Sequence, residues 1–208
     1  MDKIFNSLRK PADLVFIIGA FLYAVWFAIE TIFSIDGQVL NILGNIVVLI
    51  VGALLIALPP IMLLMHKDNL AKLFFVFLLG YWVIFSARNY LFFAETFGDS
   101  REVFPIITAI FLFIVGLLIV GILTMVILDI ILGLPALRPI IDLLALIFVG
   151  ASFIAAILFM IYAGIQGAGW TYFVKYALME MIVLPVTVGF GCLYFFRAKE
   201  GKNDEESF

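Results

Sequence analysis

Long apolar segments separated by short polar ones dominate the hydrophobicity pattern of this 208-residue chain. Six of these segments have the roughly 20 residues that a helix needs to cross a hydrocarbon layer about 30 Å thick. They cover residues 14–34, 39–65, 70–92, 104–128, 140–164 and 170–196. The sequence therefore predicts six membrane spans, with ends defined to within a few residues.

The spans are predicted to be helices and not strands of a barrel. Residues 111–126 are apolar on every face, whereas a barrel strand alternates between apolar and polar positions. A helix also satisfies its own backbone hydrogen bonds inside lipid. The expected fold is an all-α, polytopic integral membrane helical bundle, forming one domain over residues 1–198 and followed by a short polar cytoplasmic tail, 199–208.

Composition agrees with this pattern. Hydrophobic residues make up 66% of the chain and charged residues 13%, which is outside the usual range of soluble domains. The longest outer connection, roughly Ala94 to Arg101, leaves no room for a soluble domain. The expected surroundings are therefore the lipid bilayer, and no nucleic-acid partner is expected.

Basic residues predict the orientation, because lysine and arginine near span ends are retained in the cytoplasm. Of the 12 basic residues, nine lie on the side of the N-terminus and three on the other side. We expect both termini to be cytoplasmic and the first span to remain as a signal anchor. The compact, nearly loopless design favours a bacterial cytoplasmic membrane, with an organelle membrane as the alternative.

Glu180 is the most deeply placed ionisable residue. At about 1.5 Å per residue it lies about 15 Å from the start of segment 170–196, close to the middle of the membrane. Tyr176 and Thr187 share its helical face, and Pro185 frees a backbone carbonyl at a similar depth. A charge near the bilayer centre costs at least about 2.5 kcal/mol. This stretch is therefore the strongest candidate for a solute or proton site.

Five further polar residues are predicted to lie in the outer half of the membrane. They are Glu30, Asn41, Asn45, Arg88 and Lys175. If their helix faces converge, they enclose an outward-facing polar pocket above Glu180. Structural pairs, Glu30 with Arg88 and Glu180 with Lys175 or an asparagine, would explain the same residues without a function.

A second polar group is predicted at the inner ends of the fourth and fifth spans. It contains Asp129, Arg138 and Asp142. Solvated helix ends explain these residues simply. A cytoplasmic gate or a contact with a partner is the functional alternative.

Catalytic and cofactor-binding patterns are absent from the sequence. Cys192 is the single cysteine and His66 the single histidine, and there is no glycine-rich phosphate loop. We therefore expect no catalytic residue, no metal and no cofactor.

The sequence provisionally favours a small transporter or channel that is not an enzyme. One alternative is a non-catalytic membrane subunit of a transport, secretion or envelope-assembly complex, with a partner membrane subunit. Assembly as a homo-oligomer is the alternative to a partner subunit. A second alternative is an intramembrane enzyme that modifies lipid, with Glu180 and Tyr176 as its acid–base groups.

Overall fold

The computed structural model describes residues 11–33, 39–98 and 102–196, and all regular structure in these ranges is helical. The elements are α2 (Ala12–Phe33), α3 (Val39–Leu64), α4 (Asp68–Trp82), η1 (Val83–Ala87), α5 (Arg88–Gly98), α6 (Val103–Leu132), η2 (Pro135–Leu137), α7 (Arg138–Ile165), α8 (Trp170–Tyr172), η3 (Phe173–Val183) and α9 (Leu184–Phe195). The predicted all-α class is confirmed. The predicted tail, 199–208, lies outside the described residues.

Five helices have the length and apolar composition of membrane spans. They are Ala12–Phe33, Ile42–Leu64, Val103–Leu132, Arg138–Ile165 and Trp170–Phe195. Such helices are consistent with an integral membrane protein, as the hydrophobicity pattern predicts.

The predicted third span, 70–92, is not among these five helices, and like Trp170–Phe195 it contains a π-helical segment. Residues 68–98 are helical throughout, but the π-helical segment η1 separates the 15-residue α4 from the 11-residue α5. Neither α-helical part alone has the length of a span. A π-helical stretch is often found at a functional site, so η1 makes this segment a candidate for a functional region.

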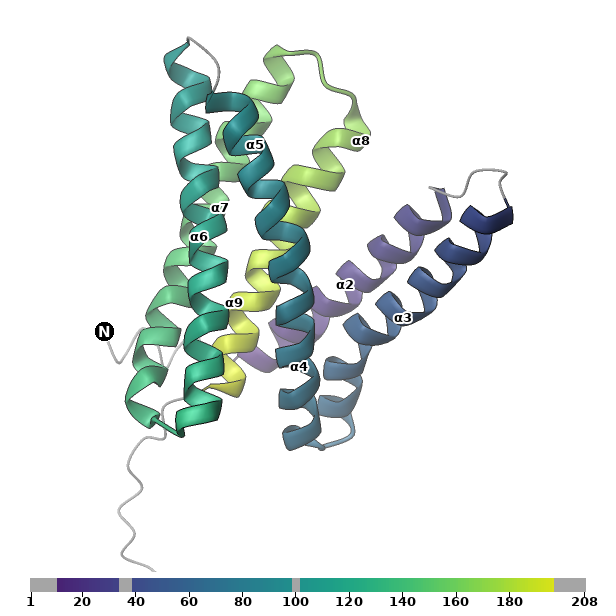
Figure 1. The fold of residues 1–208 in the computed structure, drawn as a ribbon, viewed down its shortest axis with the longest axis vertical. Helices are drawn as coiled ribbons and strands as arrows, with labels where there is room; N and C mark the ends of the chain where they lie inside the picture. The colour runs from purple at the N-terminus through teal and green to yellow at the C-terminus, as the bar shows by residue number, and fades with distance from the viewer. Residues whose placement is uncertain (1–10, 34–38, 99–101, 197–208) are drawn as a thin grey trace, which may run out of the picture.

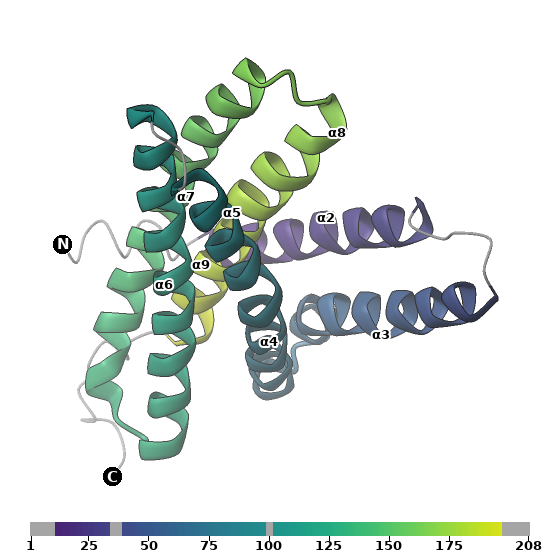
Figure 2. The same cartoon turned by 45° about the horizontal axis from the view of Figure 1, so that its top comes forward.

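The helices form an upright bundle with a hairpin that leans away from it. In Figure 1, α4 and α5, α6, α7 and the α8–α9 segment stand together, while α2 and α3 diverge toward one side. Figure 2 shows the hairpin crossing the bundle at a steep angle. Contacts agree with this arrangement, because α2 packs on α9, α3 packs on α4, and α6 packs on both α5 and α7.

Two groups of aromatic side chains fill the interior. The base cluster joins the hairpin to the bundle and contains Phe16, Phe75, Phe195 and Phe196, with the Phe16 and Phe75 ring centroids 5.4 Å apart. The Phe93 cluster joins α5, α7 and the α8–η3 segment, and contains Phe93, Phe97, Phe159, Tyr172 and Tyr176. The two clusters fix the positions of the hairpin, α5, α7 and the α8–η3 segment relative to one another.

Candidate functional site

The π-helical segment η3 carries Glu180 and exposes its backbone carbonyl. In a π-helix, each N–H bonds to the carbonyl five residues earlier, and the Leu184 N–H bonds in this way to the Met179 carbonyl. The next donor in that register would be residue 185, which is a proline without an N–H. Glu180 therefore keeps a carbonyl free of a backbone donor, and the Tyr90 hydroxyl donates a hydrogen bond to it.

The second π-helical segment, η1, positions the partners of Glu180. It ends at Ala87, just before Asn89 and Tyr90 on α5. The Asn89 side-chain amide donates to the Glu180 carboxylate, with Nδ2 and Oε2 2.9 Å apart. Two consecutive residues therefore hold Glu180 by its side chain and by its backbone. Tyr90 is fully buried, which keeps this contact away from solvent.

An ion pair lies beside this group. The Lys175 ammonium on η3 pairs with the Glu30 carboxylate on α2. About a third of each side chain is exposed, 36% for Lys175 and 35% for Glu30. The hypothesis that Glu30 pairs with Arg88 is not supported, because Lys175 takes that place and the Arg88 side chain is exposed. The pair links the hairpin to the helix that carries Glu180.

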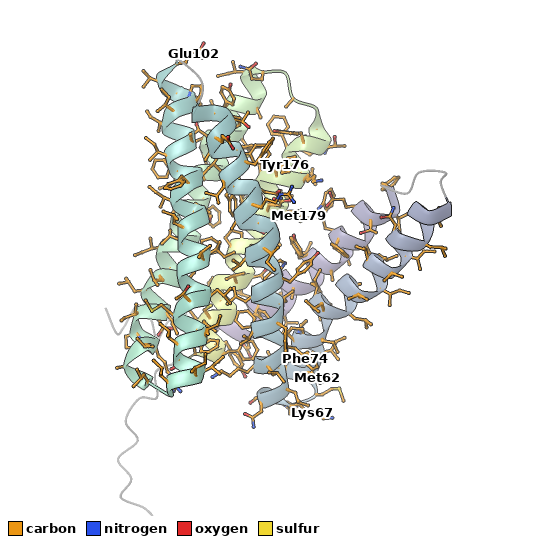
Figure 3. The ribbon with its side chains drawn as sticks, in the orientation of Figure 1. Met62, Lys67, Phe74, Glu102, Tyr176 and Met179 are labelled. Atoms are coloured by element: carbon orange, nitrogen blue, oxygen red, sulfur yellow. The ribbon has the colours of Figure 1, made fainter. Side chains whose placement is uncertain are left out.

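These groups line one cavity of about 420 Å³. Its walls come from the hairpin, from α4 and α5, and from η3. The lining residues are Tyr23, Phe27, Glu30, Thr31, Asn45, Val48, Tyr81, Asn89, Lys175, Tyr176 and Glu180. Figure 3 shows Tyr176 between η3 and α5, where its ring meets Phe93 at a centroid distance of 4.9 Å.

The cavity brings together five of the eight residues predicted for this site. Glu30, Asn45, Lys175, Tyr176 and Glu180 line it. The side chain of Asn41 lies outside the described residues. Whether the five act on a solute stays a prediction.

Two predicted residues do not reach the cavity. Arg88 is exposed, and Thr187 is fully buried against Gly19, with its hydroxyl 2.6 Å from the Val183 carbonyl that it donates to. The prediction that Thr187 and Tyr176 share one helical face assumed 3.6 residues per turn. The π-helical segment η3 has more residues per turn, so the two side chains point in different directions. Thr187 is therefore a contact between α9 and α2.

Sequence reasoning missed the closest partners of Glu180. Asn89 and Tyr90 follow Arg88 directly, so the correct segment was recognised and the wrong residue was chosen. The aromatic side chains Tyr23 and Tyr81 were also missed. Polar side chains at residues 89 and 90 of a largely apolar segment were the available signal.

The second predicted group lies at the turn between α6 and α7. Arg138 Nε donates to Asp129 Oδ1 at 3.4 Å across this turn. Asp129 and Asp142 are buried, at 4% and 2% exposed, so the interpretation of these aspartates as solvated helix ends is wrong. A gate or a partner contact at this place stays a prediction.

Comparisons with known proteins found no similar protein. No protein-family model matches the chain, and comparisons with curated proteins and with solved structures find no match. Within the described ranges, histidine, cysteine and acidic side chains form no group of three that could hold a metal ion.

Proposed function

We propose that this chain is a six-span integral membrane transporter or channel, and that the cavity around Glu180 is its solute or proton site. The observation that carries the proposal is a glutamate, held by Asn89 at its carboxylate and by Tyr90 at its backbone carbonyl, on the wall of a 420 Å³ cavity. Polar and ionisable groups inside a membrane are costly and mark solute or proton pathways. The π-helical segment η3 carries Glu180, and η1 ends two residues before Asn89, which donates to that carboxylate.

The geometry leaves Glu180 able to bind a solute. Asn89 donates to Oε2 and orients the carboxylate, which keeps acceptor capacity on Oε1. Small-molecule sites usually occupy about 300–1,000 Å³, so the cavity has a suitable size. The lining combines apolar and aromatic walls with a few polar groups, as such sites usually do.

We propose that helix 68–98 is a sixth span and that both termini are cytoplasmic. Support for six spans comes from the helical structure of every residue from 68 to 98, with η1 between α4 and α5, and support for the orientation comes from the excess of basic residues on one side. Lys67 and Glu102 lie at opposite ends of the bundle (Figure 3), as the ends of one membrane crossing should.

Cysteine labelling tests this orientation. Gln166 and Met65 are exposed in turns, whereas the native Cys192 is fully buried. In intact cells, Gln166→Cys is expected to react with a membrane-impermeant maleimide, and Met65→Cys is expected to react only after permeabilisation. The wild-type protein controls for labelling of Cys192. Reaction of both new cysteines from outside would contradict the proposed orientation.

Native mass spectrometry followed by reconstitution tests the function. We expect the tagged chain, gently extracted from its own host, to be a monomer or homo-oligomer and to carry solute or proton flux in liposomes. A stoichiometric foreign subunit would instead make the chain an accessory component of a larger complex. A pure preparation that stays impermeable to every ion and solute tested would contradict the transport proposal.

A further inference from the structure

The charge of the cavity lining favours one sign of ligand. The lining contains two carboxylates, Glu30 and Glu180, and one ammonium, Lys175. Lys175 pairs with Glu30, so their charges offset each other, while the Glu180 carboxylate has a neutral donor, Asn89. With both carboxylates ionised, the lining carries one net negative charge. A monovalent cation would neutralise it.

The aromatic walls favour an organic cation. Tyr23, Phe27, Tyr81 and Tyr176 line the same cavity, and aromatic faces attract ammonium groups. The ring of Tyr176 already lies near a cation, because the Lys175 ammonium is 5.2 Å from its centroid. Hard metal cations instead require a shell of oxygen ligands, which aromatic faces do not supply.

The size and position of the cavity indicate an apolar substituent on that cation. A volume of 420 Å³ exceeds that of a bare ion and suits a small organic molecule. Val48 of α3 lines the cavity and is also 51% exposed, so the cavity reaches the lateral surface of the protein. This surface lies on the diverging α2–α3 hairpin (Figure 1), where membrane lipid would surround it.

We propose that the cavity binds a monovalent organic cation with an apolar substituent, its charged group at Glu180 and its apolar part against Phe27 and Val48. This inference rests on the proposed function, because it names the class of solute that the site takes. The aromatic rings of Tyr23, Tyr81 and Tyr176 line the same cavity and are available to contact the cation. A molecule of this kind can enter from the bilayer through the side of the cavity.

Equilibrium binding of three probes of similar shape tests this proposal. Phenyltrimethylammonium is the cation, tert-butylbenzene is its neutral analogue, and benzenesulfonate is an anion of comparable size. Titration calorimetry on the full-length protein in nanodiscs, with empty nanodiscs as the control, measures each affinity. We expect the cation to bind at least about tenfold more tightly than the other two, since only it has a favourable Coulomb interaction with the lining.

Two variants that change the charge of the lining then test whether the charged group of the ligand lies at Glu180. Glu180→Gln should weaken binding of the cation at least about tenfold, because it removes the negative charge. Lys175→Met should strengthen binding, because Glu30 then has no cation beside it. Both variants must keep the elution volume and melting temperature of the wild type. If either variant does not fold, the sign preference of the wild-type protein still decides the proposal.

The outcomes separate this inference from the proposed function. Preference for benzenesulfonate, equal binding of all three probes, or no binding would overturn the inference, and flux assays would still test transport. Weaker binding in Lys175→Met would overturn the assigned charge arrangement. Tight, Glu180-dependent binding of the cation without any flux would support the inference and contradict transport.

Discussion

Glu180→Gln is expected to reduce solute flux in proteoliposomes by about 100-fold while leaving the fold intact. Glutamine keeps a side-chain oxygen that can accept the Asn89 amide, and the Tyr90 hydroxyl still meets the backbone carbonyl of residue 180. The negative charge is the main property lost. Loss of one charge interaction of about 3 kcal/mol corresponds to this fold-change. Flux of the identified solute, normalised to reconstituted protein, measures the effect.

A matched variant controls for the loss of charge itself. Glu95 lies on α5 close to Asn89 in sequence, but its side chain is exposed and does not line the cavity around Glu180. Glu95→Gln should therefore keep wild-type flux. Normal flux in Glu180→Gln, with the variant correctly folded, would remove Glu180 from the mechanism and leave it as a structural residue.

Gly191→Ala is expected to lower the stability of the protein by about 1–3 kcal/mol, the usual cost of overpacking a core. A Cβ atom at this position would overlap the ring of Phe75 and lie 3.0 Å from Phe16 Cδ2. Phe75 cannot easily move, since Phe16, Phe195 and Phe196 surround it in the base cluster. Thermal unfolding in detergent, followed by intrinsic fluorescence, measures the change.

A second glycine provides the comparison. Gly150 lies inside α7, and a Cβ atom there would have nothing within 4 Å. Gly150→Ala should leave the melting temperature unchanged or raise it slightly, because alanine favours the helix. Equal melting temperatures for the two variants would show that the base cluster tolerates an added methyl group, and the close approach of α9 to α2 and α4 would then not limit stability.

The sequence predicted the helices well, because length and apolar composition depend on local residues. Segments 14–34 and 140–164 correspond to α2 and α7 to within a few residues. The division of helix 68–98 was not predicted. A π-helical turn has the same composition as the α-helix around it, so nothing in Val83–Ala87 distinguishes it. Tertiary contacts at Asn89 and Tyr90 accompany this turn.

Depth along the membrane was more predictable than direction around each helix. Counting residues from the span ends assigned Glu30, Asn45 and Lys175 to the outer half of the membrane, and the structure places them around one cavity. The predicted side-chain direction around the helix axis was wrong at Thr187, because a π-helical segment precedes this residue and changes the helical phase. The predicted direction was also wrong at Arg88, because that residue directly follows the π-helical segment η1.

Helix neighbours could not be predicted from the sequence, because apolar faces carry little information about their partners. The contact of α2 with α9 joins the first and last helices of the described chain. A further contact of α2 with η3, the segment that precedes α9, brings Glu30 beside Lys175 instead of Arg88. Helices of similar composition could pack in many other orders and still satisfy the same hydrophobicity pattern.

The contact between α2 and α9 also has a consequence for the order in which the protein assembles during translation. Helix α2 is synthesised before the other helices that the structure describes, yet its partner α9 begins only at Leu184. At roughly 5–20 residues per second, α2 would wait on the order of ten seconds or more before its partner is complete. During this interval Glu30 has no Lys175 beside it, and the nascent chain presents an unpaired carboxylate that a membrane chaperone or quality-control protease could recognise.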